Sequence, residues 1–327
     1  MSGAPARERG AALLAVLLLV VVVGAIAAAV LEKVSLSRAA AANAAAQDVA
    51  RGYADGVERL ALVAIDDLLA REPRRTTLAG GWNGAVREIP LPEGALARVR
   101  LADGGNCFNI NSVVSGDPRV RLTRRPSGVA GFVALMLALD VPEGDARQIA
   151  EAAADWADSD TIVGPGGAED GVYMSGARPY RTGNTLFADI GELARLQGMT
   201  PAIFARLAPF VCALPTSDLA PINVNTLLPG QAPLLAMLAP GQLDIGRAEA
   251  ALASRPAEGW ESQADFWQSG PLRGLAVPLD LRMQAQVRTT WFALDVDVRA
   301  GDIAVRETAL VDARVRPSRL AARRRME

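Results

Sequence analysis

A long apolar run near the start of the chain is the clearest element in its pattern of hydrophobic and polar positions. Residues 11–31 are 21 consecutive uncharged residues, almost all Ala, Val, Leu or Ile. A helix rises about 1.5 Å per residue, so a run of this length crosses the roughly 30 Å hydrocarbon core of a bilayer. The pattern predicts one membrane-spanning helix behind a short leader, residues 1–10, in which Arg7 and Arg9 favour the inner side.

The helical pattern continues well past the apolar run. Residues 32–69 are rich in Ala, Leu, Arg and Glu, and they contain no proline. Apolar side chains recur there at spacings of three and four, at Val49, Tyr53, Val57, Leu60 and Ala64. Glu72-Pro73 ends the pattern, since the residue before a proline disfavours the helical conformation. We expect one helix over residues 11–72, half in the membrane and half packed against a globular head.

The rest of the chain alternates between strand-like and helical stretches. Alternating runs predict strands at residues 85–91, 95–102, 106–114, 287–300 and 303–315, the last two joined as a hairpin at Ala300-Gly301-Asp302. Helical spacings occur at residues 128–141, 145–159 and 227–267. These patterns predict an α+β fold, in which a small antiparallel sheet head from residues 73–114 and 283–316 is interrupted by a large helical insertion, residues 115–282. The basic run at residues 317–327 is expected to be a solvated tail.

Composition argues against several classes of function. The 327 residues include no histidine, which removes the commonest general base and metal ligand, and with them Ser-His-Asp and Cys-His catalysis. The net charge of −2 provides no concentrated basic face for nucleic-acid phosphates. We therefore expect neither an enzyme nor a nucleic-acid-binding protein.

One acidic stretch has the composition of a calcium-binding loop. Calcium takes six to eight oxygen ligands, several of them anionic, from a loop that can wrap the ion. Asp158, Asp160 and Glu169 stand at the first, third and twelfth positions of a twelve-residue window, as in an EF-hand, and Asp170 follows. Ile162 and Val163 do not fit that motif, so the loop would be of another design, bent at Gly164-Pro165-Gly166-Gly167. The carboxylates would repel one another without a cation. The alternative is a solvated acidic surface loop.

The two cysteines, Cys107 and Cys212, are candidates for a disulfide. A membrane-anchored chain whose leader stays inside sends its body to the periplasm, where thiols are oxidised. Cys107 precedes Phe-Asn-Ile-Asn-Ser, and Cys212 precedes a similar strand, Ile-Asn-Val-Asn-Thr, by about ten residues. The alternative is a pair of buried free thiols.

The leader resembles that of the type IV pilin and pseudopilin family, in which a prepilin peptidase cuts after a glycine and the helix stays on the protein. The resemblance implies cleavage between Gly10 and Ala11 and methylation of Ala11. Most members carry a glutamate at the fifth residue after the cut, but this chain has Ala15. That departure is similar to the K-type minor pseudopilin of type II secretion. The alternative is an ordinary uncleaved membrane anchor.

The body of the chain also resembles the K-type pseudopilins, most specifically at Asp155-Trp-Ala-Asp-Ser-Asp160, Gly167-Ala-Glu-Asp170 and the following Ala-Arg-Pro-Tyr-Arg-Thr-Gly-Asn184. In that family the region binds calcium, usually a pair of ions. The resemblance thus implies one or two structural Ca²⁺ ions, with Asp155 and Asn184 added to Asp158, Asp160, Glu169 and Asp170 as ligands.

The function implied by the resemblance is structural. A K-type subunit lies at the tip of the pseudopilus and supports its initiation and protein secretion across the outer membrane. Its partners are the I-type and J-type minor pseudopilins, the prepilin peptidase and components of the inner-membrane secretion assembly. The implied location is the inner membrane, crossed once, with a periplasmic head.

A second segment favours a different function. Residues 222–267 resemble a helix-hairpin-helix module, which grips DNA backbones through amides of a Gly-x-Gly turn. Here Pro240-Gly241-Gln242 stands at that turn, Asp244 follows, and Glu249, Glu258 and Glu261 make the segment acidic. The runner-up function is a membrane-tethered, pilin-like protein that binds DNA. A third, a tethered hydrolase using the acidic cluster, is disfavoured by the lack of histidine.

Overall fold

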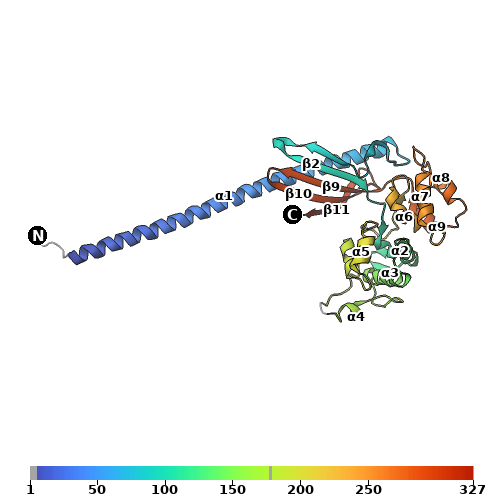
Figure 1. The fold of residues 1–327 in the computed structure, drawn as a ribbon, viewed down its shortest axis with the longest axis horizontal. Helices are drawn as coiled ribbons and strands as arrows, with labels where there is room; N and C mark the ends of the chain where they lie inside the picture. Colours follow the sequence, from blue (N-terminus) through green and yellow to red (C-terminus); the bar gives the residue numbers. More distant parts are fainter. Residues whose placement is uncertain (1–5, 177–178, 327) are drawn as a thin grey trace.

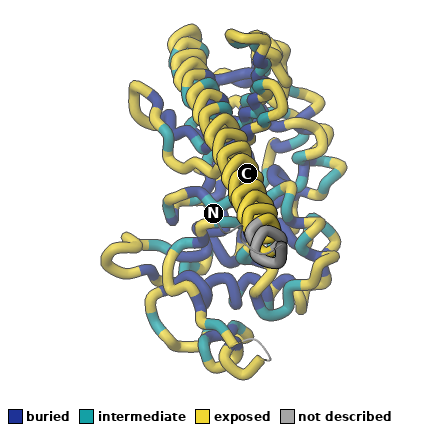
Figure 2. Tube along the Cα trace, turned by 90° about the vertical axis from the view of Figure 1, so that its left-hand side faces the viewer, coloured by how far each residue is buried: buried dark blue, intermediate teal, exposed yellow. Residues whose placement is uncertain are grey.

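A single long helix dominates the molecule. The computed structural model describes residues 6–176 and 179–326, and its first element is the 66-residue helix α1 (Ala6–Arg71), which projects from the body (Figure 1). Every large apolar side chain from Leu13 to Val34 is exposed (Figure 2). Of the described residues, only this helix is long and apolar enough to cross a membrane, with a mean hydropathy of 3.2 in its most apolar window.

The second half of α1 packs on one face of a sheet, along a stripe that begins with alanines and continues with larger apolar residues. Ala50, Ala54 and Val57 are buried against sheet side chains that include Leu294 and Val298. The stripe continues at Ile65 and Leu69, which contact Trp82, Phe292 and Val311. The buried face of α1 therefore differs from the predicted one. Val57 is buried as predicted, but Val49, Leu60 and Ala64 are exposed. Alanines face the sheet because their short side chains let the helix approach it closely.

The sheet contains five antiparallel strands in the order β1-β2-β9-β10-β11. The strands are β1 (Val86–Pro90), β2 (Leu96–Asp103), β9 (Trp291–Ala300), β10 (Ile303–Asp312) and β11 (Arg319–Met326), and short 3-10 turns at Ala79–Gly81 and Pro92–Gly94 precede β1 and β2. Ile303 pairs with Ala300, so β9 and β10 form the predicted hairpin. Its turn includes Gly301, whose φ of 58° is the left-handed conformation that glycine adopts readily.

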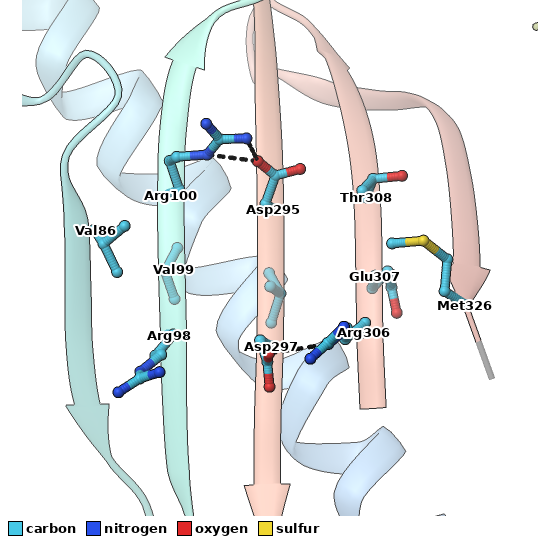
Figure 3. Close-up of a pocket in the computed structure, with 11 residues that line it drawn as sticks. Val86, Arg98, Val99, Arg100, Asp295, Asp297, Arg306, Glu307, Thr308 and Met326 are labelled. Atoms are coloured by element: carbon cyan, nitrogen blue, oxygen red, sulfur yellow. Dashed lines mark hydrogen bonds and ion pairs between the residues drawn. The ribbon is translucent and has the colours of Figure 1, made fainter. Parts of the chain in front are cut away.

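The sheet face that looks away from α1 is polar. Side chains alternate along a strand, so the residues between the buried ones point outward. A cross-strand ion pair joins Arg98 to Glu88 (2.9 Å). Two more join Arg100 to Asp295 and Arg306 to Asp297 (3.1 Å) (Figure 3). They line a shallow hollow of about 310 Å³. The charges on this face are thus neutralised by their neighbours.

The basic C-terminal run is a strand, and the expectation of a solvated tail over residues 317–327 was wrong. Residues Arg319–Met326 form edge strand β11, which pairs with β10. Arg323 donates to Glu58 of α1 at 2.7 Å and lies 2.8 Å from Glu307 of β10, and Arg325 binds Asp55 at 2.6 Å. Glu58 and Glu307 are buried between helix and sheet. The arginines of β11 are held there because these carboxylates require cationic partners.

Residues 106–114, expected in the head sheet, lie in the helical part. Phe108–Asn109 (β3) pairs in parallel with Val211–Cys212 (β6), a 3-10 turn covers Ile110–Val113, and Val114–Asp117 (β4) forms a hairpin with Arg121–Arg124 (β5). Phe108 stacks on Phe132 in the helical core, with ring centroids 5.0 Å apart. Burial of this ring draws the segment away from the sheet after Asp103.

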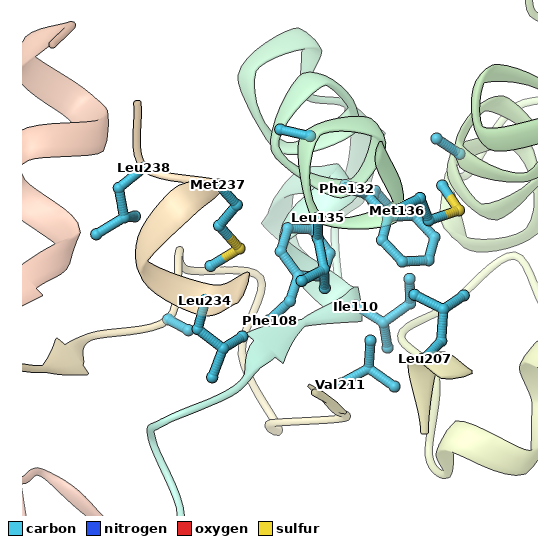
Figure 4. Close-up of a cluster of buried hydrophobic side chains, with 14 of the residues drawn as sticks. Phe108, Ile110, Phe132, Leu135, Met136, Leu207, Val211, Leu234, Met237 and Leu238 are labelled. Atoms are coloured by element: carbon cyan, nitrogen blue, oxygen red, sulfur yellow. The ribbon is translucent and has the colours of Figure 1, made fainter. Parts of the chain in front are cut away.

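The helical part has one continuous core (Figure 4). Its elements are α2 (Pro126–Ala138), α3 (Glu143–Ala157), α4 (Asp170–Tyr173), η4 (Ile190–Arg195), α5 (Pro201–Leu207), η5 (Pro229–Gln231), α6 (Ala232–Ala236), α7 (Ile245–Ala253), α8 (Gln263–Gln268), η6 (Gly270–Leu272) and α9 (Leu279–Gln284). Strand β7 (Ile222–Asn223) pairs in parallel with β8 (Ala285–Gln286), so the start and the end of the second half of the helical part lie side by side. Helix α2 contacts α6, which carries Leu234, so the core joins both halves.

The two similar motifs, Asn109-Ile-Asn111 and Asn223-Val-Asn225, perform the same structural task. Asn111 accepts from the amide of Phe187 at 2.6 Å, and Asn225 accepts from the amide of Trp260 at 2.7 Å. Each side-chain amide also donates to a backbone carbonyl. The helical part is therefore built from two related halves, in each of which a buried asparagine fixes a buried aromatic residue.

A buried polar cluster connects the helical part to the sheet. Asp103, at the end of β2, accepts from Thr226 (2.6 Å), from Thr289 and from the amide of Gly105 (3.0 Å). Asn106 donates to the Thr226 hydroxyl at 2.9 Å. Burial raises the pKa of Asp103 to about 6 despite these donors. The cluster ties the sheet to both connections that lead into and out of the helical part.

Candidate calcium site

The candidate site lies where α3 ends. The last turn of α3 is held in the core by Trp156, whose ring contacts Tyr173 (5.6 Å between centroids) and Phe187 (6.2 Å). This packing buries the preceding residue, Asp155, which is 1% exposed. Asp158 caps the helix, and the loop then runs to Glu169, next to α4. Figure 1 shows α4 at the end of the helical part farthest from the sheet.

The glycine run folds the loop back over Asp155. The amide of Gly164 donates to the Asp155 carboxylate at 3.0 Å, and a side chain at Gly167 would collide with that carboxylate. Gly166 has a φ of 81°, which favours glycine. The pKa of Asp155 is raised, and burial is the largest cause. The bend expected at residues 164–167 thus serves to enclose a buried acid.

Asp158 and Glu169 give the strongest support for a cation site here. Each is 4% exposed, and each has one carboxylate oxygen, Asp158 Oδ1 and Glu169 Oε1, buried without a hydrogen-bond partner. Burial, followed by the charges of Asp160 and Asp155, raises the pKa of Asp158 to about 6. Burial and the charges of Asp155 and Asp158 raise the pKa of Glu169 to about 7. Buried carboxylates in this state are stabilised by a cation that they share.

Asp160 and Asp170 are more exposed and already have partners. Asp160 accepts from the amide of Ile162 at 3.0 Å and lies 3.7 Å from Arg121. Asp170 accepts from the amide of Thr182 at 2.9 Å, which lowers its pKa, and lies 3.6 Å from Arg181. The two arginines flank the acidic loop and partly offset its charge.

Thr182 connects the two ends of the site, although it was not among the predicted ligands. Its hydroxyl lies 3.4 Å from Glu169, 3.0 Å from Asp170 and 3.0 Å from the side-chain oxygen of Asn184. Asn184 has a φ of 45° and donates its amide to the carbonyl of Trp156. A Thr-x-Asn sequence after an acidic loop is too common to mark a site, so only the folded chain reveals this contact.

The six predicted ligands are therefore close in the fold, but they do not form a tight cluster. Nowhere in residues 6–176 and 179–326 do three or more Asp, Glu, Cys or His side chains converge as a preformed metal site. Asp155, Asp158 and Glu169 form the buried centre, with Asp160, Asp170 and Asn184 around it. All donors are oxygens, and two of them lack partners, which fits a hard cation such as Ca²⁺ better than a transition metal.

The cysteines lie on neighbouring strands. Cys107 and Cys212 form a disulfide, with Cα atoms 5.7 Å apart and a sequence separation of 105. The bond joins the entry of the helical part to the end of its first half, beside the β3–β6 pair. Gly10 and Ala11, the expected processing residues, both lie within α1.

The helix-hairpin-helix-like segment uses its turn for packing. The side chain of Asp244 caps α7 by accepting from the amide of Arg247 at 2.8 Å, and Gln242 exchanges hydrogen bonds with Ala276. Arg247 donates to the carbonyl of Pro271 at 2.6 Å. A carboxylate thus occupies the helix N-terminus where a DNA phosphate would bind, which argues against DNA binding here.

Comparisons with known proteins agree with this architecture. Two family models for the type II secretion system protein K match residues 106–216 and 222–288. The chain is 32% identical to the type II secretion system protein K of Pectobacterium carotovorum over 90% of both chains, and 32% identical to that of Aeromonas hydrophila over 92% of this chain and 91% of the relative. A chain in the crystal structure of the GspK–GspI–GspJ complex from enterotoxigenic Escherichia coli superposes with a TM-score of 0.73 at 31% identity, over 85% of this chain and 96% of that chain. The chain belongs to the type II secretion system protein K family.

Proposed function

We propose that this chain is a structural, non-enzymatic minor pseudopilin at the tip of the type II secretion pseudopilus, where it supports initiation of the filament and protein secretion across the outer membrane. The observation that carries the proposal is the likeness, over most of both chains, to a chain of the three-protein GspK–GspI–GspJ complex. By the same likeness, its partners are the I-type and J-type minor pseudopilins.

Maturation of the chain follows from its anchor. A prepilin peptidase would cut between Gly10 and Ala11, Ala11 would be methylated, and α1 would hold the head in the periplasm from the inner membrane. The fully exposed apolar stretch of α1 supports an anchor that contacts lipid before assembly and neighbouring helices afterwards. Ala15 gives this subunit no carboxylate to pair with the terminal amine of a subunit above it, which suits the first position in the filament.

The shape of the head supports the tip position. The helical part extends sideways from the end of the sheet that is remote from the N-terminus (Figure 1). A further subunit that stacked on top would have to occupy the same space. The chain would therefore end a filament and would not be incorporated along its length.

Calcium would order the outer end of the helical part. Asp155, Asp158 and Glu169 would supply buried oxygens, and Asp160, Asp170 and Asn184 would complete the set. The two unpartnered carboxylate oxygens and the raised pKa values of Asp158 and Glu169 support such an ion. When bound, it supplies positive charge to acids that repel one another, so its role would be structural.

Counting subunits in filaments tests the tip position. Pseudopili are sheared from cells, separated by length, and probed for this chain and for the major subunit. A tip protein is present in constant number per filament, so its ratio to the major subunit falls in inverse proportion to length. A ratio that stays constant with length would place the chain along the filament and contradict the proposal.

A further inference from the structure

The helical part and the sheet have separate hydrophobic cores. The core of the helical part includes Phe132 and Leu235, whereas the clusters between α1 and the sheet include Phe292 and Leu294. In the part of the chain that the structure describes, none of these clusters contains side chains of both the helical part and the five-stranded sheet. Two parts of a chain that share no large apolar interface are expected to move relative to one another.

The two parts are joined at one end of the sheet (Figure 1). The chain leaves the sheet after Asp103 and returns to it at Trp291, and the amide of Gly104 donates to the carbonyl of Trp291 at 2.9 Å. The hydroxyls of Thr226 and Thr289 both donate to the carboxylate of Asp103. The covalent connections and these polar contacts therefore meet at one place, which can act as a pivot.

Away from this junction, an ion pair connects the two parts. Arg324 of β11 lies 2.8 Å from Asp189, the residue that precedes η4 in the helical part. Arg319 is at the junction end of β11, because its partner Asp312 pairs with Trp291. Arg324 is five residues farther along the strand, so the ion pair lies about 15 Å from the pivot. A contact at this distance resists rotation of the helical part about the junction.

Arg324 is held in place by its neighbours on β11. Arg323 donates to Glu58 of α1 at 2.7 Å, and Arg325 donates to Asp55 of α1 at 2.6 Å. Because side chains alternate along a strand, Arg324 points to the opposite face of the sheet. The flanking arginines thus fix the strand, and the arginine between them reaches the helical part.

Asp189 is held in place by the helical part. Its Oδ1 accepts from the amide of Gly191 at 2.7 Å, while its Oδ2 faces Arg324. Glu192 accepts from the amide of Asp189 at 3.1 Å and from the indole of Trp156 at 3.3 Å. Since Trp156 belongs to the core of the helical part, the carboxylate of Asp189 moves with that core.

We propose that the ion pair between Asp189 and Arg324 is a latch, and that the helical part swings as one body about the junction at Asp103 when the pair is broken. The two side chains are 61% and 38% exposed, with Arg324 the more exposed, so the pair is weak and is screened by salt. A second ion pair, between Arg314 and Asp218 at 3.8 Å, follows β10 at the junction end and has less leverage. The latch does not depend on the calcium site or on the position of the chain in a filament.

The distance between two spin labels tests the latch on the full chain in detergent. Val86→Cys places one label on β1, and Val120→Cys places the other between β4 and β5 of the helical part, at side chains that are 61% and 83% exposed. The native cysteines are joined in a disulfide and are not labelled. Double electron–electron resonance at low salt should give one main distance for this parent protein. High salt should broaden the distribution.

Two substitutions break the latch. Arg324→Met and Asp189→Asn should each raise the ratio of open to latched molecules by up to about fivefold at low salt. Asparagine keeps the cap of η4, because its side-chain oxygen still accepts from the amide of Gly191. The double variant should be no more open than either single variant, since both changes remove the same interaction. The matched control is Arg306→Met, which removes an arginine of the same sheet face whose partner, Asp297, lies within the sheet, and it should leave the distances unchanged.

Three results would overturn the proposal. Equal distance distributions in the parent and in both latch variants, at low and at high salt, would mean that the ion pair does not hold the helical part. Opening by Arg306→Met as large as that by Arg324→Met would assign the effect to the sheet. Additive opening in the double variant would show that the two residues do not act as a pair.

Discussion

Asp158 and Glu169 each bury one carboxylate oxygen that has no hydrogen-bond partner, and the charge of Asp158 raises the pKa of Glu169. The two residues come from opposite ends of one loop, which is folded back on Asp155 by glycines. Repulsion among three buried acids would destabilise this loop if no cation were bound. A cation among these acids would offset their repulsion and stabilise the loop, as we propose.

The buried carboxyl of Asp103 predicts that stability depends on pH. Its folded pKa, about 6, is above its ordinary value. The stabilisation that protonation confers is therefore fully present below about pH 4 and is lost as pH rises through 6. From this group alone, the free energy of unfolding at pH 5 should exceed that at pH 7.5 by about 1.4 kcal/mol.

The measurement for Asp103 is urea unfolding at both pH values with calcium absent, for the wild type and for Asp103→Asn. The substitution keeps the hydrogen bonds to Thr226 and Thr289 possible but does not titrate. The difference between the two pH values should shrink in the variant. An unchanged difference would assign the pH dependence to other acids.

The arginines of β11 are predicted to hold α1 against the sheet. Arg323→Met would leave Glu58 and Glu307 buried without their shared cation, and it should destabilise the fold by about 3 kcal/mol. Arg324→Met is the matched control, since Arg324 is exposed and pairs with Asp189, and it should cost less than about 1 kcal/mol. Chemical denaturation followed by tryptophan fluorescence measures both. Equal effects would contradict the assignment.

The disulfide is predicted to stabilise the helical part. A bond between Cys107 and Cys212 closes a loop of about a hundred residues, and its removal typically costs roughly 2–5 kcal/mol. The double variant Cys107→Ser/Cys212→Ser should melt well below the wild type and should not respond to a reducing agent. A wild type that melts at the same temperature with and without reductant would show that the bond contributes nothing.

The two related halves make matched substitutions possible. Asn111→Ala and Asn225→Ala each leave the amide of a buried aromatic residue, Phe187 or Trp260, without its acceptor. Each should cost about 1–3 kcal/mol. Hydrogen exchange at the Phe187 and Trp260 amides should rise only in the half that was changed. Loss of protection in both halves together would mean that the helical part unfolds as one unit.

The long helix and the sheet were predictable because their signals are local. An uncharged run of 21 residues and a proline-free continuation mark α1, and alternation with a Gly301 turn marks the β9–β10 hairpin. The buried face of α1 was misjudged because alanines face the sheet while Leu60 points to solvent. Hydrophobicity alone does not show that close packing, and not side-chain size, decides which face is buried.

Contacts between residues that are far apart in the sequence were not predictable. The arginine-rich end at Arg323 looks like a solvated tail until α1 and β10 place Glu58 and Glu307 beside it. In the candidate site, the acids were visible because they lie within one stretch of sequence. The roles of Thr182 and Arg121 depend on how the loop closes, which no single window of sequence contains.

Calcium-dependent unfolding of the protein is the decisive test of the proposed calcium site. Melting of the full chain in detergent is followed with calcium and with chelator, for the wild type, Glu169→Gln and the control Glu143→Gln, which changes an exposed acid paired with Arg147 on the solvent side of α3. We expect a clear rise in melting temperature with calcium in the wild type and the control, and little or none in Glu169→Gln, whose chelated form should be at least as stable as the chelated wild type. Identical melting of the wild type with calcium and with chelator would contradict the proposed site.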